Sequence, residues 1–299
     1  MEHQKWDGNN IPDQKGRIAI VTGSSSGIGF EAARALASKN ATVIIAVRNM
    51  EKGKSAADKI RVLHKNADVH VMELDLANLE SVRSFAKAFK DKFNKLDLLI
   101  NNAGVMIPPY SKTKDGFELQ FGTNHLGHFA LTGLLIDLLK STKDSRIVNV
   151  ASTAHKYGNI DFNDLNWEKR KYKAWRAYGD SKISNLYFTY ELQRKLEEEK
   201  STVKVTAAHP GWTATELQRH SRVFEFMNGF FAMKPWQGAL PTLRAATDDA
   251  AQSGDYFGPD GWQEWRGYPK KVESNALSYD KTIAAKLWDV SESLTGIKF

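Results

Sequence analysis

Short apolar segments alternate with longer segments of helical character along most of this 299-residue chain. Strands separated by a whole helix cannot form hairpins, so they pair in parallel through right-handed crossovers. The sequence therefore predicts an α/β fold: a doubly wound, Rossmann-like parallel sheet with helices on both faces, in a single domain over residues 1–299. Six strands are expected, at residues 17–22, 42–47, 69–74, 96–100, 147–151 and 203–208.

Helical periodicity fills the intervals between these strands. Apolar residues recur every three or four positions from Leu79 to Phe93, as in an amphipathic helix. Residues 212–236, with an apolar patch from Val223 to Met233, are expected to form either a lid over a substrate or a helix buried against the protein. Residues 1–15 are expected to form an N-terminal extension. The other expected helices cover residues 30–39, 52–63, 117–139, 177–199 and 237–246.

The composition excludes several classes of function. The absence of cysteine rules out disulfides, thiolate metal sites and a cysteine nucleophile, and no histidine-rich motif indicates a metal ion. No segment reaches 18 uninterrupted apolar residues, so we expect a cytoplasmic protein without a transmembrane segment. The net charge of +7 favours anionic ligands. The one dense basic and aromatic cluster, residues 167–176, belongs to no nucleic-acid-binding module, so we expect a solvated loop there and no nucleic-acid partner.

The stretch TGSSSGIG, from Thr22 to Gly29, joins the first strand to the first helix. Glycines at such a turn let a ligand approach the backbone, and the helix that follows offers unpaired N–H groups to an anion. The spacing matches neither the P-loop nor the common G-x-G-x-x-G pattern. The turn therefore predicts either a pyrophosphate site, with its three serines as hydrogen-bond donors, or an ordinary tight turn.

The end of the second strand discriminates between the two nicotinamide dinucleotides. Folds that select NAD place an acidic residue there, whereas this chain has Arg48, whose guanidinium suits a 2′-phosphate. The sequence thus favours NADP over NAD. Lys52 either adds charge nearby or is a solvated helix-start residue, and Asp75 and Leu76 are placed to meet an adenine edge. Residues 101–104 (NNAG) end the fourth strand at the same edge of the sheet.

Tyr178 and Lys182 lie one helical turn apart, so both side chains share a face of the helix expected at residues 177–199. A neighbouring ammonium favours the phenolate, so we expect Lys182 to lower the pKa of Tyr178 toward the range useful for acid–base catalysis. The preceding strand ends at Ser152, which brings a hydroxyl to the edge where the glycine turn lies. Alone, a Y-x-x-x-K pair is common by chance.

Five motifs, namely TGSSSGIG, NNAG, Ser152, YGDSK and HPG (residues 209–211), occur in an order that resembles the short-chain dehydrogenase/reductase family. Residues 146–155, 209–217 and 266–270 are similar to the branch that contains retinol dehydrogenases, the WW-domain oxidoreductase and protochlorophyllide-reductase-like proteins. The resemblance spans nearly the whole chain. It implies an oxidoreductase that moves a hydride between a nicotinamide and a small-molecule alcohol, aldehyde or ketone, which we expect to be apolar.

The resemblance also implies roles for individual residues. Tyr178 would exchange a proton with the substrate oxygen, Lys182 would also bind the nicotinamide ribose, and Ser152 would hydrogen-bond the substrate. Asn124 would help to hold a proton-relay water. The implied cofactor contacts are Gly23, Ser25, Ser26, Gly27, Ile28 and Gly29 at the pyrophosphate and ribose, Asn102, Ala103 and Gly104 near the adenine ribose, and Pro210, Gly211 and Thr213 beside the nicotinamide. The family often pairs through its two long helices, which implies a homodimer or homotetramer.

Some features depart from the family pattern or leave alternatives open. Ser152 and Tyr178 lie 26 positions apart (178 − 152), more than is typical of the family, and the added residues either roof the site or, as we favour, lie on the surface. His125 and His128 are expected to serve packing or hydrogen bonding rather than catalysis. A dinucleotide-binding regulatory protein without turnover, and an epimerase or dehydratase of the extended family, stay as alternative functions.

Overall fold

The computed structural model describes residues 5–213 and 232–299. Its centre is an eight-stranded sheet in the order β3-β2-β1-β4-β5-β6-β7-β8. The first seven strands run parallel, and β8 is antiparallel to β7. The predicted doubly wound α/β fold is confirmed. The strands are β1 Ile18–Thr22, β2 Thr42–Val47, β3 Val69–Glu73, β4 Leu98–Asn101, β5 Arg146–Val150, β6 Lys204–Ala208, β7 Tyr256–Pro259 and β8 Pro269–Val272.

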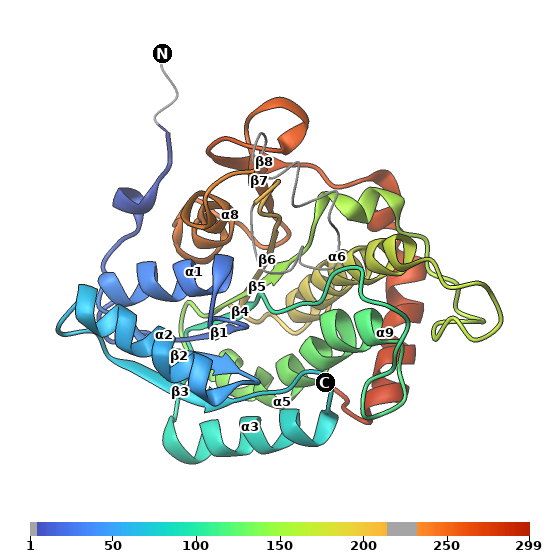
Figure 1. Cartoon of the computed structure of the whole chain (residues 1–299), viewed down its shortest axis with the longest axis horizontal. Coiled ribbons are helices and arrows are strands. Elements are labelled where there is room, and N and C mark those ends of the chain that lie inside the picture. The colour runs from blue at the N-terminus through green and yellow to red at the C-terminus, as the bar shows by residue number, and fades with distance from the viewer. Residues whose placement is uncertain (1–4, 214–231) are drawn as a thin grey trace.

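Helices cover both faces of this sheet (Figure 1). The helices α1, α2 and α8 share one hydrophobic core with the sheet, and α3, α5, α6 and α9 share the core on the opposite face. The bounds are α1 Gly27–Ser38, α2 Met50–Leu63, α3 Leu79–Lys92, α4 Leu119–Phe121, α5 Gly127–Ser141, α6 Ala174–Glu198, α8 Pro235–Thr247 and α9 Lys281–Thr295.

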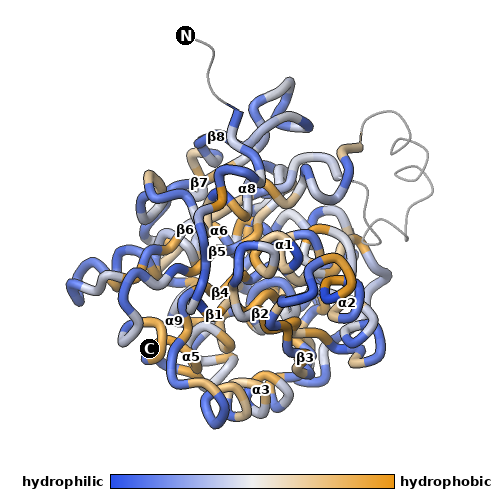
Figure 2. The backbone as a smooth tube through the Cα atoms, turned by 90° about the vertical axis from the view of Figure 1, so that its left-hand side faces the viewer, coloured by the Kyte–Doolittle hydropathy of each residue, from blue (hydrophilic) through white to orange (hydrophobic). Residues whose placement is uncertain are grey.

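The two cores follow from the alternation of side chains along each strand. In β1, Ala19 and Val21 face the α1 side, whereas Ile20 faces the α3 side, and all three are fully buried. A strand covered on both faces needs apolar residues at every position, which is why these strands were visible in the sequence. Figure 2 shows the hydrophobic segments gathered around the sheet and the hydrophilic ones in the outer loops.

The helix predicted at residues 117–139 is interrupted. The short helix α4 leads into a π-helical turn, Gly122–Leu126, before α5 begins at Gly127. A π turn within a helix shifts the hydrogen-bond register and often marks a functional site. Here it contains Asn124, one of the expected site residues.

The N-terminal segment belongs to the folded body from residue 5 onward. Trp6 and Ile11 are buried in the core that contains α1 and α8. The Gln14 N–H donates to the Lys39 carbonyl at the end of α1, at 2.7 Å. Part of the expected N-terminal extension, residues 5–15, therefore packs against the core.

The last part of the chain supplies an outer helix that the sequence analysis did not predict. Helix α9 packs along α6, and its Trp288 ring lies 5.1 Å from the ring of Phe129 in α5. The C-terminal Phe299 packs on the same ring at 4.9 Å. Helices α5 and α6 are therefore covered by the chain's own C-terminal region.

Most of the candidate lid, including its apolar patch up to Phe231, lies outside the described residues. At its two ends, Thr213 and Met233 form an isolated parallel bridge, and both are buried. The helix expected at residues 237–246 is present as α8.

Candidate active site

The candidate site lies along the edge formed by the carboxyl ends of the parallel strands. The register of the sheet aligns Thr22 with Ala46, and Val150 with Ala208, so the turns that follow β1, β2, β5 and β6 open on one edge. Ligands of open α/β sheets bind at such an edge. The fold therefore brings the predicted motifs together.

The glycine turn is built so tightly that two of its positions exclude any side chain. Gly23 has φ +67°, and a Cβ there would lie 2.8 Å from the Ala103 Cα. At Gly29, a Cβ would lie 2.5 Å from the Asn102 amide nitrogen and 2.6 Å from the Gly23 carbonyl. These contacts bring the glycine turn against the NNAG segment and leave a backbone cradle at the start of α1.

The three serines of this turn differ in their environment. Ser24 is fully buried and donates to the Val21 carbonyl at 2.7 Å, so its hydroxyl is used inside the protein. The expectation that all three serines face a ligand is wrong for this one. Ser25 and Ser26 are partly exposed, and the Ser26 hydroxyl makes no capping bond to α1. With Gly27, Ile28 and Gly29, which begin α1, they offer hydroxyl and N–H donors that fit a dinucleotide pyrophosphate.

Arg48 follows β2 directly and is exposed. Within residues 5–213 and 232–299, its guanidinium has no ion-pair or hydrogen-bond partner, and Lys52 nearby is also exposed. Asp75 follows β3 and partly uses its carboxylate to accept the Ala77 N–H at 3.0 Å. Leu76 is buried, and the backbone of α5 at Gly127 packs on it. In the part of the chain that the structure describes, both cations are unpaired and available to a phosphate.

Thr22, a residue that the sequence analysis did not single out, ties the glycine turn to the NNAG segment. Its hydroxyl oxygen accepts the N–H groups of Asn102 and Ala103, each at 2.9 Å. The Asn102 amide donates to the Thr22 carbonyl at 2.8 Å. A threonine directly before a glycine turn was the available sequence signal.

Ser152, Tyr178 and Lys182 meet where β5 ends against α6. Tyr178 is 8% exposed, and the ammonium of Lys182 lies 5.7 Å from its ring centroid. Burial raises the pKa of Tyr178 to about 12, against a smaller lowering by a hydrogen bond with Ser152. This direction is opposite to the expected lowering by Lys182, because the buried phenolate loses its hydration. The phenol is therefore protonated at neutral pH.

Lys182 is held by the end of β5. Its Nζ donates to the Val150 carbonyl at 3.0 Å, and the Asn185 amide donates to the same oxygen at 3.1 Å. Burial lowers the pKa of Lys182 to about 8. A Cβ at Gly104 would lie 3.7 Å from Nζ and 3.1 Å from the Asn124 Oδ1, so the NNAG segment closely approaches both residues.

Asn124 is fully buried in the π turn, and both the oxygen and the nitrogen of its side-chain amide are hydrogen-bonded. Its Oδ1 accepts the Val105 N–H at 2.8 Å, and its Nδ2 donates to the Val105 carbonyl at 3.0 Å and to the Ser181 hydroxyl at 2.9 Å. The amide thereby joins the loop after NNAG to α6.

The segment after β6 turns sharply at the expected nicotinamide border. Gly211 has φ +64°, and a Cβ there would lie 2.6 Å from the Trp265 carbonyl. The Thr213 hydroxyl donates to the Pro210 carbonyl at 2.9 Å and is buried, so it stabilises this turn.

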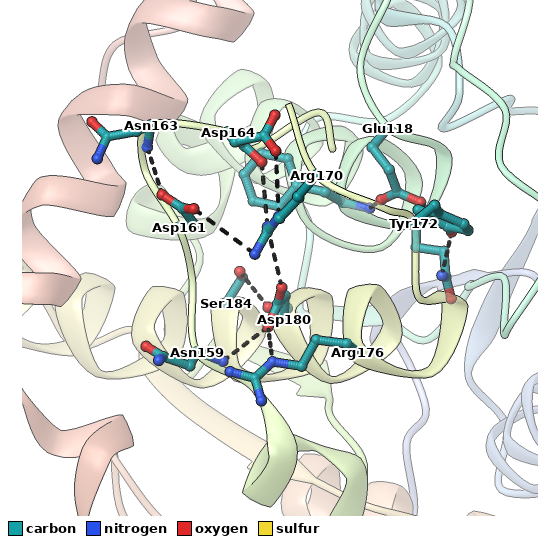
Figure 3. A network of polar contacts seen from close by, with 12 residues as sticks. Glu118, Asn159, Asp161, Asn163, Asp164, Arg170, Tyr172, Arg176, Asp180 and Ser184 are labelled. Carbon is teal, nitrogen blue, oxygen red and sulfur yellow. Dashed lines mark hydrogen bonds and ion pairs between the residues drawn. The ribbon is translucent and has the colours of Figure 1, made fainter. Parts of the chain in front are cut away.

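The residues added between Ser152 and Tyr178 form an ordered layer on α6. Arg170 stacks on Trp167, with its guanidinium 3.7 Å from the ring centroid, and lies 3.4 Å from Asp164 and 3.9 Å from Asp180 (Figure 3). Trp167 is 7% exposed. The expectation of a solvated loop is therefore wrong for this part. Burial raises the pKa of Asp180 to about 6, against lowering by a backbone N–H and the two arginines beside it, Arg170 and Arg176.

Among residues 5–213 and 232–299, no three histidine, cysteine or carboxylate side chains cluster so that they could hold a metal ion. No helix in these ranges combines the length and apolarity needed to cross a bilayer.

The comparisons with known proteins identify the class. A family model described as short chain dehydrogenase matches residues 17–225. The chain therefore belongs to the short-chain dehydrogenase family, as its motifs predicted, and is an NAD(P)-dependent oxidoreductase that acts on CH–OH donors.

The individual relatives confirm the predicted branch. Retinol dehydrogenase 11 of Homo sapiens is 44% identical over 287 residues, which cover 94% of this chain and 86% of that protein. Retinol dehydrogenase 13 of Homo sapiens is 42% identical, with coverages of 95% and 86%. Among solved structures, an uncharacterized protein from Mycobacterium paratuberculosis has 42% identity and a TM-score of 0.83 over 99% of both chains. The RhlG–NADP complex of Pseudomonas aeruginosa, at 24% identity and a TM-score of 0.64, covers 81% of this chain and 94% of that one and shows the shared fold.

Proposed function

We propose that the chain is an NADP(H)-dependent oxidoreductase that interconverts an apolar alcohol and its aldehyde or ketone, with Tyr178 as the acid or base. The observation that carries this proposal is the buried arrangement of Ser152, Tyr178 and Lys182 at the edge where the glycine turn forms its cradle. A nicotinamide dinucleotide supplies or accepts the hydride when it is bound.

In the direction of reduction, Tyr178 acts as the acid. A phenol with a pKa of about 12 carries its proton at neutral pH and donates it to the substrate oxygen as negative charge develops there. Ser152 hydrogen-bonds that oxygen and orients the carbonyl. The Lys182 cation stabilises the phenolate that Tyr178 becomes, and the Val150 carbonyl fixes the position of its Nζ.

The preference for NADP rests on charge. Arg48 directly follows β2, and Lys52 lies in the first turn of α2; within residues 5–213 and 232–299 neither side chain has an ion-pair or hydrogen-bond partner, and a 2′-phosphate would give both a strong counter-charge. The RhlG–NADP complex has the same fold, which agrees with this choice.

An apolar substrate is supported by the aromatic side chains beside Tyr178. The ring of Trp175 lies 6.1 Å from Tyr178, and that of Tyr157 lies 6.2 Å from Trp175. Trp175 and Tyr157 are 40% and 60% exposed, so an aromatic surface leads from solvent to the buried phenol. The names of the retinol dehydrogenase relatives agree with an apolar alcohol.

The primary test is the oxidation of NADPH, and of NADH in parallel, against a panel of aldehydes and ketones of increasing chain length. Turnover should be faster with NADPH and with apolar substrates. Tyr178→Phe should abolish turnover and leave NADPH binding nearly intact, whereas Tyr190→Phe, a buried tyrosine of the same helix that bonds Ser274, should keep turnover. Full activity in Tyr178→Phe would contradict the mechanism.

The cofactor preference has its own test. Arg48→Asp should shift the ratio of NADPH to NADH affinities by at least about tenfold toward NADH, because a hydrogen bond to a charged group contributes about 1.5–3 kcal/mol. Lys59→Asp makes the same charge change at an exposed position of α2 and should leave the ratio unchanged. An unchanged ratio in Arg48→Asp would remove the reason for NADP.

A further inference from the structure

The ring of His128 is buried beside the candidate site. It lies in the first turn of α5, four residues after Asn124, and is 2% exposed. Its Nδ1 lies 2.9 Å from the Asn124 carbonyl, and its Nε2 lies 2.9 Å from the Thr22 hydroxyl. The ring thus contacts both the π turn and the residue that precedes the glycine turn.

The chemistry of the partners fixes the direction of each bond. A carbonyl oxygen can only accept, so Nδ1 must carry the proton and donate it to Asn124. Burial is the main cause that lowers the pKa of His128 to about 4, against a raising by the bond to the Asn124 carbonyl and with a smaller lowering by the charge of Lys182. The ring is therefore neutral at physiological pH, and Nε2 is an acceptor.

This assignment determines the role of the Thr22 hydroxyl. Its proton points to Nε2 at 2.9 Å rather than to the Ile100 carbonyl at 3.4 Å. Its lone pairs then accept the N–H groups of Asn102 and Ala103. One directional chain of hydrogen bonds runs from the NNAG backbone through Thr22 and His128 to the carbonyl of Asn124.

We propose that His128 is a positioning residue, whose ring fixes the glycine turn and the NNAG segment relative to Asn124 and thereby sets the distance between the phosphate cradle and the Tyr178–Lys182 pair. Without the ring, the Thr22 hydroxyl loses its acceptor at 2.9 Å, the Asn124 carbonyl loses a donor, and the cradle loses its link to α5. Because the ligand in question is a nicotinamide dinucleotide, this inference rests on the proposed function.

His125 provides a matched control. It lies on the same helical segment, three residues before His128, and is 1% exposed. Its Nε2 bonds the Ser291 hydroxyl of α9 at 2.8 Å, on the side away from the glycine turn. Loss of this ring should lower stability without altering the cofactor site.

Two conservative variants separate the two bonds. The amide nitrogen of His128→Asn stands near the place of Nδ1 and keeps the donor for Asn124, but it loses Thr22. The amide oxygen of His128→Gln stands near the place of Nε2 and keeps the acceptor for Thr22, but it loses Asn124. His128→Leu removes both bonds.

The experiment combines hydrogen exchange of the cofactor-free protein with titration of NADPH and NADH and with turnover. His128→Leu should speed exchange at the Asn102 and Ala103 amides and weaken dinucleotide binding by about tenfold, which is the usual effect of one lost buried hydrogen bond. His128→Asn should share the faster exchange at these amides. His128→Gln should keep it near the wild-type rate and lower kcat more than it lowers affinity. His125→Leu should change only the melting temperature.

The outcomes distinguish the two proposals. Wild-type exchange and wild-type dissociation constants in both His128→Asn and His128→Leu would overturn the positioning role. Equal changes in His125→Leu would also overturn it, since a general loss of packing would then explain them. If the wild-type protein reduced no carbonyl compound, the proposed function would fail, whereas exchange and dinucleotide titration would still decide the role of His128.

Discussion

Replacement of Arg170 by Met should destabilise the protein through the layer that joins Ser152 to Tyr178. Arg170 is the cation shared by Asp164 at 3.4 Å and by Asp161 and Asp180 at 3.9 Å (Figure 3). The side chains of Asp164 and Asp180 are only 5% and 9% exposed, so neither carboxylate regains full hydration when the cation is removed.

The expected magnitude follows from this burial. Removal of one partner from a fully buried ion pair costs about 3–5 kcal/mol. Arg170 is 30% exposed and its contacts are longer than charge-assisted hydrogen bonds, so we expect a loss of about 2 kcal/mol in the free energy of unfolding. Arg176 is the matched control: it is 42% exposed, and among the described residues its one ion-pair partner is Asp180 at 3.5 Å, so Arg176→Met should lose less than about 1 kcal/mol.

The loss should also depend on pH. The pKa of Asp180 is raised from 3.8 to about 6, so its neutral form favours folding, and that contribution is lost as the pH rises through 6. Without Arg170 this pKa rises further, because one of the charges that lowers it is gone. The destabilisation should therefore be greater at pH 7.5 than at pH 5, where Asp180 is protonated in both proteins.

Urea denaturation followed by tryptophan fluorescence, at pH 5 and pH 7.5, measures these differences. Asp180→Asn combined with Arg170→Met should recover part of the loss at pH 7.5, because the unpaired carboxylate is removed. Equal losses in Arg170→Met and Arg176→Met, or a loss that does not change with pH, would refute the reasoning.

Three further predictions concern the site and its buried charges. Gly29→Ala should weaken dinucleotide binding and lower the free energy of unfolding by about 1–3 kcal/mol, because its Cβ would lie 2.6 Å from the Gly23 carbonyl. Gly8→Ala, where a Cβ has no neighbour within 4 Å, should change neither the melting temperature nor dinucleotide binding. The rate of carbonyl reduction should fall as the pH rises through about 8, where Lys182 loses its charge; a flat profile to pH 10 would contradict this role. The pKa of His128 is lowered from 6.5 to about 4, so the neutral ring should contribute about 3 kcal/mol to the free energy of unfolding, present above pH 6.5 and lost toward pH 4. The urea midpoint of His128→Gln should therefore depend less on acid pH than that of the wild type.

The sequence was most informative where strands are buried on both faces. Six strands were found within a few residues of their observed bounds because their apolar runs are continuous. The strands β7 and β8 gave no such signal: Tyr256–Pro259 contains glycine and proline, and β8 is an edge strand with exposed Lys270 and Lys271. Helix α9 has apolar residues at helical spacing, but no helix was predicted at residues 281–295.

The residues of the candidate site were predictable from the sequence, but their burial and their interaction partners were not. Strand ends placed Ser152 and the glycine turn on one edge, and the four-residue spacing placed Lys182 beside Tyr178. The rise in the pKa of Tyr178 depends on burial by distant segments, which spacing cannot reveal. The partners of Arg170 are likewise known only once the chain is folded, so its basic and aromatic surroundings suggested a solvated loop.

The outer helix α9 bears on how this protein can associate with itself. The homodimer or homotetramer that the family suggests would use the two long helices, α5 and α6. In this chain, Trp288 and Phe299 already cover the ring of Phe129 on α5, and Lys195 of α6 lies 4.7 Å above the Trp288 ring. A second copy that approached the faces of α5 and α6 covered by α9 would have to displace α9 or exchange it for its own. Self-association without such an exchange must leave these covered faces unused.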